Sequence, residues 1–84
     1  MAETILVLGA CGQVGTELVE NLQNIHGEGN VISSDIRKSD HPVFANGIFE
    51  TLDVLDKKKI TEVFAKHKPT VVYHLAALPS ATAE

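Results

Sequence analysis

The sequence predicts an α/β fold built on a parallel sheet, with the element order β-α-β-(β)-α-β. Two observations carry this prediction. Several short runs are continuously apolar and rich in β-branched residues, which is typical of strands buried on both faces of a parallel sheet. Between these runs, apolar residues recur every three or four positions, the spacing of one face of a helix. Strands that alternate with helices in this way are joined by right-handed crossovers.

The first half of the chain contains a strand, a helix and a second strand. Residues 4–8, TILVL, read as a buried strand. A helix is predicted over residues 13–25, with an inward face formed by Val14, Leu18, Leu22 and Ile25. The segment 27–30, GEGN, holds the turn and C-cap residues that end a helix. The second strand follows at residues 31–34 and ends at Asp35.

The second half repeats this alternation after a loop. Residues 37–47 have no period and are interpreted as a connecting loop, followed by a third strand at residues 48–54. Asp56 is a suitable N-cap for a second helix, and Pro69 ends it. The inward face of that helix is predicted to consist of Ile60, Val63 and Phe64. Residues 70–75, TVVYHL, are expected to form another buried strand.

Length and composition limit the classes of protein to be considered. Eighty-four residues suffice for one small domain, so residues 1–84 are expected to be a single, partial domain with no second one. The net charge of −4 argues against a nucleic-acid backbone or an anionic membrane as the main partner. No basic segment precedes the first apolar run, and a single cysteine cannot form an internal disulfide. These features predict a cytoplasmic protein.

Three glycines stand between the first strand and the first helix, at Gly9, Gly12 and Gly15. The free N–H groups and the positive dipole end of a helix attract an anion at this place, and a diphosphate is the obvious candidate. In such a motif Gly9 allows the sharp turn, Gly12 lets the anion approach, and Gly15 lets helix and strand pack closely. The alternative is a glycine-rich turn that serves compact packing alone.

Asp35 ends the second strand twenty residues beyond Gly15, the spacing at which a carboxylate reaches the adenosine ribose of a bound dinucleotide. A carboxylate accepts hydrogen bonds from both ribose hydroxyls and repels a 2′-phosphate, which favours NAD over NADP. Arg37 weakens this preference, because a guanidinium can contact a 2′-phosphate or stack on adenine. The alternative for Asp35 is a turn residue at a strand end.

These motifs resemble a known family. The segments GACGQVG at 9–15, Asp35, LDV at 52–54 and HLAA at 74–77 look like the extended short-chain dehydrogenase/reductases, the NAD-dependent epimerase/dehydratase family. Within it, the chain is most similar to the short-chain type of L-threonine 3-dehydrogenase. The resemblance covers essentially the whole chain but only the first quarter or so of such an enzyme. It implies the N-terminal part of a Rossmann fold.

The resemblance also implies roles for particular residues. Cofactor-binding residues would be Gly9, Gly12, Gln13, Val14, Gly15, Asp35, Arg37, Asp53, Val54, Leu75, Ala76 and Ala77. Among them, Asp53 and Val54 would lie against the adenine ring, while the small residues at 75–77 would leave room for the cofactor or merely pack the start of a helix. Ser80 corresponds to a position near the substrate, although a serine that opens a helix is often an N-cap.

The resemblance also implies general acid–base catalysis by a tyrosine and a lysine four residues later. The only tyrosine here is Tyr73, and residue 77 is alanine, so no catalytic residue is assigned and the 84-residue chain alone should be inactive. The favoured hypothesis is the cofactor-binding portion of an enzyme that oxidises L-threonine to 2-amino-3-oxobutanoate, a homo-oligomer when complete. The alternatives are a nucleotide-sugar epimerase or dehydratase fragment and a small non-catalytic nucleotide-binding protein.

The remaining reactive side chains are expected to be structural. Cys11 is interpreted as a small filler in the loop, and His74 as a hydrogen-bonded core histidine within a buried strand. The other histidines, His26, His41 and His67, have no neighbours in the sequence with metal-ligand spacing. No metal site is predicted.

Overall fold

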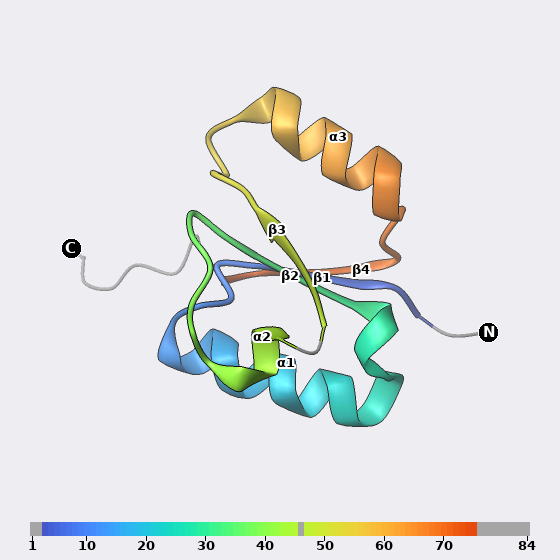
Figure 1. The fold of residues 1–84 in the computed structure, drawn as a ribbon. Coiled ribbons are helices and arrows are strands. Elements are labelled where there is room, and N and C mark those ends of the chain that lie inside the picture. Colours follow the sequence, from blue (N-terminus) through green and yellow to red (C-terminus); the bar gives the residue numbers. More distant parts are fainter. Residues whose placement is uncertain (1–2, 46, 76–84) are drawn as a thin grey trace.

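The computed structural model describes residues 3–45 and 47–75, and in them a central parallel sheet has the strand order β3-β2-β1-β4 (Figure 1). The strands are β1 (Ile5–Leu8), β2 (Val31–Asp35), β3 (Ile48–Thr51) and β4 (Val71–His74). The helices are α1 (Gln13–His26), α2 (Pro42–Ala45) and α3 (Lys57–His67), and a 3-10 turn spans Glu28–Asn30. The predicted α/β class and parallel sheet are therefore confirmed.

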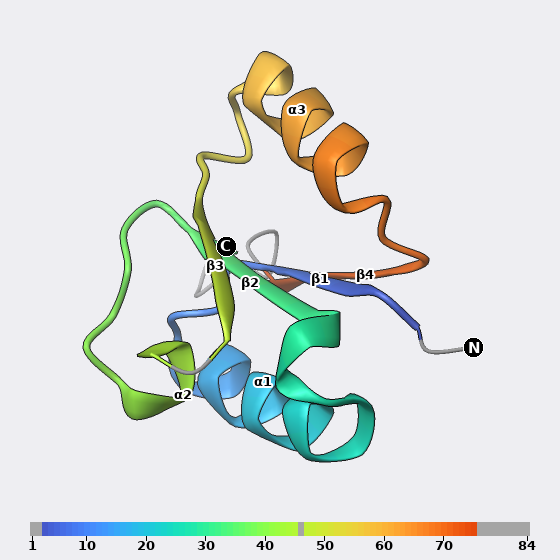
Figure 2. The same ribbon diagram turned by 45° about the vertical axis from the view of Figure 1, so that its right-hand side comes forward.

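The elements form three layers. Helices α1 and α2 lie on one face of the sheet and α3 lies on the other, as the two views in Figures 1 and 2 agree. Alternate residues of the strands supply a core for each face. The core under α1 and α2 includes Val7, Val31 and Phe44, while the core under α3 includes Leu6, Ile32 and Val63. Strand β1 is buried on both faces, as its unbroken apolar sequence predicts.

Local signals set the ends of the two long helices. Helix α1 ends at Gly27, whose φ of 92° is accessible to glycine and whose N–H donates to the carbonyl of Gln23. Helix α3 begins after Asp56, whose carboxylate accepts the N–H of Lys59 at 3.1 Å, as predicted for an N-cap. It ends one residue before Lys68, which adopts a left-handed conformation.

The inward face of α1 differs from the prediction. Leu22 is buried and Leu18 packs against the core, as predicted, but Val14 and Ile25 are 64% and 72% exposed. Gly15 and Val19 are buried in their place. The helix is rotated because Gly15 has no side chain and packs directly on the backbone beneath it. A periodicity count that gives weight to large apolar residues alone does not detect this closest point of contact.

Predictions for other elements also need correction. Strand β4 is partly exposed rather than buried, with Val72 at 41% and Tyr73 at 36%, because it lies at the edge of the described sheet. His74 at its end is exposed and is not a core histidine. Strand β3 stops at Thr51, three residues early. The predicted loop at 37–47 contains α2, which packs Phe44 into the core. Phe64, predicted to face inward, is 36% exposed.

The pairing register aligns the carboxyl ends of the strands. Leu8 at the end of β1 lies between Ser34 of β2 and His74 of β4. Asp35 in turn pairs with Thr51 at the end of β3. Strand β1 has β2 and then β3 on one side and β4 on the other, so the strand order reverses at β1. Ligands of open α/β sheets bind in the crevice at such a reversal.

Within the described part of the chain, no helix combines the length and the apolar character that crossing a bilayer requires.

Candidate functional site

The loop after β1 makes a sharp turn that is fastened to β2. Gly9 has a φ of 80°, which L-residues with a side chain rarely adopt. The N–H groups of Gly9 and Ala10 both donate to the carbonyl of Ser34, each at 2.9 Å. The predicted role of Gly9 in the turn is therefore supported by its backbone geometry.

Gly15 and Gly12 lie in opposite surroundings. A Cβ at Gly15 would stand 2.6 Å from the carbonyl oxygen of Ala10, so helix α1 and the loop can pack only because this residue is glycine. A Cβ at Gly12 would meet no atom within 4 Å, and the φ of −73° there suits any residue. Nothing in the packing of the described chain therefore requires glycine at position 12.

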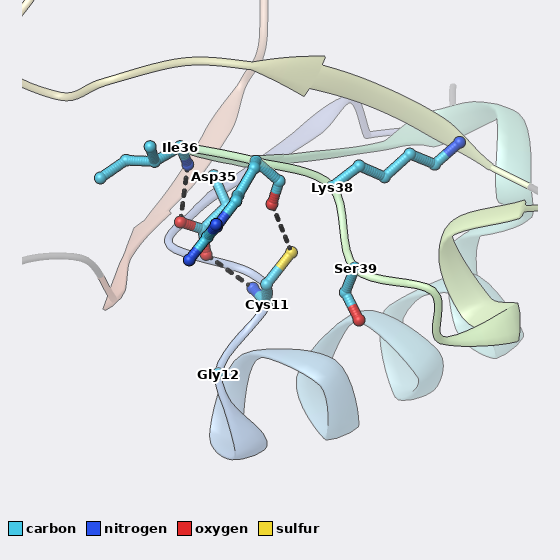
Figure 3. A pocket seen from close by; sticks show the side chains of 7 residues that line it. Cys11, Gly12, Asp35, Ile36, Lys38 and Ser39 are labelled. Atoms are coloured by element: carbon cyan, nitrogen blue, oxygen red, sulfur yellow. Dashed lines mark hydrogen bonds between the residues drawn. The ribbon is translucent and has the colours of Figure 1, made fainter.

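Asp35 reaches from the end of β2 to this loop (Figure 3). Its Oδ2 accepts the N–H of Cys11 at 2.9 Å and its Oδ1 accepts the N–H of Ile36 at 2.7 Å. The carboxylate is thus held between the glycine loop and the chain that leaves β2. Twenty-six residues separate Cys11 from Arg37, whose carbonyl lies 3.4 Å from the Cys11 thiol.

A cavity of about 500 Å³ opens where the ends of β1, β2 and β3 meet. Its lining includes five of the predicted site residues: Gly9, Gly12, Asp35, Asp53 and Val54. Asp53 turns the chain there by accepting the N–H of Leu55 on its carboxylate at 2.9 Å. The fold therefore brings together residues that are as far apart as 9 and 54 in the sequence.

A second cavity, of about 660 Å³, also borders Asp35 and shares Gly12 and Ile36 with the first. Cys11, Gly12, Arg37 and Lys38 contribute to its wall. Lys38 extends away from Asp35 in Figure 3, and its ammonium lies 6.0 Å from the centre of the Phe49 ring. The exposed side chains of Arg37 and Lys38 therefore border this cavity. The hydrogen bonds that hold Asp35 come from backbone N–H groups and not from these two side chains.

The other predicted residues are placed differently. Gln13 lines a third cavity of about 320 Å³ beside the start of α1. Val14 is exposed, Gly15 is buried beneath the loop, and Leu75 packs against the core on the α1 side. Ala76, Ala77 and Ser80 lie outside the described residues.

Three residues that line the 500 Å³ cavity were not among the predicted site residues: Ile36, Leu52 and Leu55. Ile36 and Leu55 border the 500 Å³ cavity although they are 64% and 84% exposed. Ile36 directly follows Asp35, and Leu55 lies two residues after Asp53. An apolar side chain at a polar strand-end turn is the signal that could have identified them, since scattered apolar residues elsewhere on a surface need no such explanation.

The Cys11 thiol near the site is not activated. Burial raises the pKa of the Cys11 thiol, and the nearby Asp35 charge adds to this effect, so the thiol stays protonated at neutral pH. This agrees with its interpretation as a filler. Among residues 3–45 and 47–75, no group of three or more His, Cys, Asp or Glu side chains is placed to hold a metal ion.

Comparisons with known proteins agree with this geometry. A sequence model described as the NAD dependent epimerase/dehydratase family matches residues 5–84. An uncharacterized epimerase/dehydratase of Staphylococcus saprophyticus is 46% identical over 81 residues, which cover 95% of this chain and 25% of that relative. The chain thus spans about a quarter of the length of the curated relatives that it matches.

Solved structures show the same likeness. The L-threonine dehydrogenase of Clostridium difficile is 46% identical with a TM-score of 0.88, over 99% of this chain and 26% of that one. The UDP-glucose 4-epimerase of Thermotoga maritima is 30% identical with a TM-score of 0.74, over 93% and 25%. Because the family model matches nearly the whole chain and the strand order is that of the corresponding part of these structures, the chain belongs to the NAD dependent epimerase/dehydratase family.

Proposed function

We propose that these residues bind NAD, as the cofactor-binding portion of an NAD-dependent oxidoreductase. The observation that carries the proposal is Gly12: its conformation is open to any residue and its surroundings are empty, yet it is glycine and it borders all three cavities around the loop. A side chain there would fill the space in which a diphosphate approaches the backbone. The residues present therefore fit a dinucleotide.

The phosphates would be held by backbone N–H groups at the start of α1. Gly12 is the N-cap and has no side-chain cap, and the first residues of a helix carry N–H groups without partners inside the helix. The motif residues Gln13, Val14 and Gly15 would supply these donors, and the helix dipole would add a positive potential. The first turn of α1 contains no acidic residue that would oppose an anion.

Asp35 would accept hydrogen bonds from the adenosine ribose. Each carboxylate oxygen accepts one backbone N–H and retains a second acceptor position for a hydroxyl. A 2′-phosphate would meet this negative charge at short range, so NAD is favoured over NADP. Arg37 and Lys38 line the neighbouring cavity and reduce this preference without reversing it.

The adenine ring would lie in the 500 Å³ cavity. Asp53 and Val54 border it, and the exposed side chains of Ile36 and Leu55 offer apolar surface to the faces of a flat ring. The assignment of Leu75, Ala76 and Ala77 to the cofactor wall and of Ser80 to the substrate remains a prediction.

The complete protein would oxidise L-threonine to 2-amino-3-oxobutanoate. Bound NAD would accept the hydride, and the residues described here would bind and orient it. Support comes from the similarity to the Clostridium difficile L-threonine dehydrogenase. The chain itself has one tyrosine and no lysine four residues after it, so we expect the 84 residues alone to be inactive. We expect the complete protein to be a homo-oligomer in the cytoplasm.

An epimerase or dehydratase that acts on a nucleotide-sugar is the second candidate. It is favoured by the similarity to an epimerase/dehydratase of Staphylococcus saprophyticus and to the UDP-glucose 4-epimerase of Thermotoga maritima. The two candidates differ in net redox change. L-threonine should cause NADH to accumulate, measured by its absorbance, whereas an epimerase would convert UDP-glucose with no net NADH.

The proposed cofactor is tested by titrating NAD and NADP into the complete protein and its Gly12→Val variant, with calorimetric detection. We expect NAD to bind more tightly than NADP, and Gly12→Val to weaken NAD binding at least about tenfold because the side chain occupies the diphosphate path. The variant should remain folded, since a Cβ there meets nothing within 4 Å. Unchanged NAD affinity in a folded variant would refute the phosphate assignment.

A further inference from the structure

Asp35 makes more contacts with the protein than a ribose-binding carboxylate requires. Its Oδ2 accepts the N–H of Cys11, which lies 24 residues earlier in the chain, at 2.9 Å. Its Oδ1 accepts the N–H of Ile36 at 2.7 Å. Both contacts are drawn in Figure 3, where the carboxylate lies between the loop and the chain leaving β2. Hydrogen bonds to an ionised acceptor are about twice as strong as those between neutral groups.

These contacts add to the backbone hydrogen bonds that attach the glycine loop to β2. Gly9 and Gly12 lack the side chains that limit backbone conformations, so ordering the loop costs conformational entropy. The N–H groups of Gly9 and Ala10 are attached to the carbonyl of Ser34. The Cys11 N–H bond to Asp35 extends this attachment by one residue, up to the N-cap of α1. Together the contacts hold residues 9–11 against the end of β2.

The same contacts reduce an electrostatic conflict. A carboxylate that borders the same cavities as Gly12 would repel a diphosphate bound there. Two N–H dipoles directed at its oxygens offset part of that negative charge. The Cys11 N–H is used in this way, so the N–H groups left for phosphate begin at Gly12.

The geometry points to a second role for Asp35, as a positioning residue that holds the glycine loop in its anion-binding form before any cofactor arrives. This inference rests on the proposed function, because it concerns the loop that we assign to the diphosphate. Its consequence is specific: Asp35 should affect the binding of a diphosphate that carries no ribose at all. A residue that only accepts ribose hydroxyls would affect such a diphosphate through its negative charge alone, which replacement by alanine and by asparagine removes equally.

The test compares Asp35→Ala with Asp35→Asn in the complete protein. Both variants remove the negative charge, but asparagine keeps one oxygen that can accept the Cys11 N–H, so the difference between them isolates the hydrogen bond. Asp40→Ala, which removes an exposed carboxylate five residues further on, controls for net charge. The probes are inorganic pyrophosphate, which has no ribose, and ADP, followed by NMR titration.

We expect pyrophosphate to bind Asp35→Ala several-fold more weakly than Asp35→Asn, and Asp40→Ala to bind it like the wild type. A second readout needs no ligand. Hydrogen exchange of the Cys11 amide should be slow in the wild type and accelerate at least about tenfold in Asp35→Ala, with Asp35→Asn between them. If Asp35→Ala does not fold, the wild-type and Asp35→Asn exchange rates decide the question.

Two results would overturn the inference: equal pyrophosphate affinity in folded Asp35→Ala and Asp35→Asn, or a Cys11 amide that exchanges as fast in the wild type as in an unfolded chain. Both leave the proposed function intact as long as the wild type binds ADP and NAD. A wild type that binds neither NAD nor ADP would refute the proposed function instead, and the exchange measurement would still decide the role of Asp35.

Discussion

The three glycines of the first loop are constrained in different ways. Gly9 is required by its backbone conformation and Gly15 by contact with the Ala10 backbone, so both would be expected in a protein that bound nothing. Gly12 is different because the described structure leaves space around it. The sequence predicts a separate role for each of the three glycines, and the tertiary structure shows that Gly9 and Gly15 serve the fold whereas the packing leaves position 12 unconstrained.

Gly15→Ala should destabilise the fold. The added Cβ would stand 2.6 Å from a backbone oxygen that cannot move without moving the loop, so we expect a loss of about 1 to 3 kcal/mol in the free energy of unfolding. Urea denaturation followed by circular dichroism measures this loss. The matched control is Gly29→Ala, where a Cβ meets nothing within 4 Å. Equal stability of the two variants would contradict the close packing of α1 on the loop.

At the level of elements, sequence patterns located the helices and strands better than they oriented them. Helix α1 occupies the predicted residues within one position, but its buried face is rotated towards Gly15 and Val19. The predicted N-cap of α3 is confirmed. It could be predicted because an N-cap depends on residues that are neighbours in the chain. The orientation of a helix depends on what it packs against, which the local sequence does not contain.

Helix α3 is also joined to β3 by charge. Glu50 of β3 accepts from His67 at 2.5 Å and from Lys66 at 3.1 Å, both in the last turn of α3. The side chains of Glu50 and His67 are each 12% exposed, whereas that of Lys66 is 69% exposed and more strongly screened by water. The hydrogen bond from His67 lowers the pKa of Glu50 below its ordinary value of 4.5, with a smaller contribution from Lys66.

This lowered pKa predicts a pH dependence of stability. Because the folded protein binds the Glu50 proton less readily than the unfolded chain, the stabilisation is present above pH 4.5 and is lost as the pH falls below that value, through the folded-state pKa. Glu50→Gln should therefore be less stable than the wild type at pH 6, by up to about 1 kcal/mol, with a smaller difference at pH 3. Denaturation at several pH values measures it, with the exposed Glu62→Gln of α3 as control. A difference that does not change with pH would contradict the pairing.

At the scale of the whole molecule, the described sheet has an open edge at β4. Strand β4 pairs with β1 on one side, and its residues Val72 and Tyr73 are 41% and 36% exposed. Phe64 of α3, the helix that covers one face of the sheet, is also 36% exposed. A strand of this kind presents unpaired N–H and C=O groups beside apolar side chains, which favours pairing with another chain.

We expect the 84-residue chain to associate with itself when it is studied alone. Sedimentation velocity should show an apparent mass that rises with concentration, and Val72→Lys should shift the chain towards the monomer, because a charge at the edge opposes strand pairing. Ile25→Lys, at a side chain of α1 that is 72% exposed, serves as the control and should leave the association unchanged. A wild type that is monomeric throughout the concentration range would show that the edge is protected.

By itself the sequence determined the parallel α/β class, the position of the glycine loop, and the candidate residues Gly12 and Asp35, because each depends on local spacing and residue chemistry. Only the tertiary structure decided that β4 is an exposed edge, that Ile36 and Leu55 border the 500 Å³ cavity, and that Asp35 holds the Cys11 amide. The physical reason is that exposure, cavity walls and hydrogen bonds across 24 residues depend on which distant segments come together, and a single strand or turn carries no record of its neighbours.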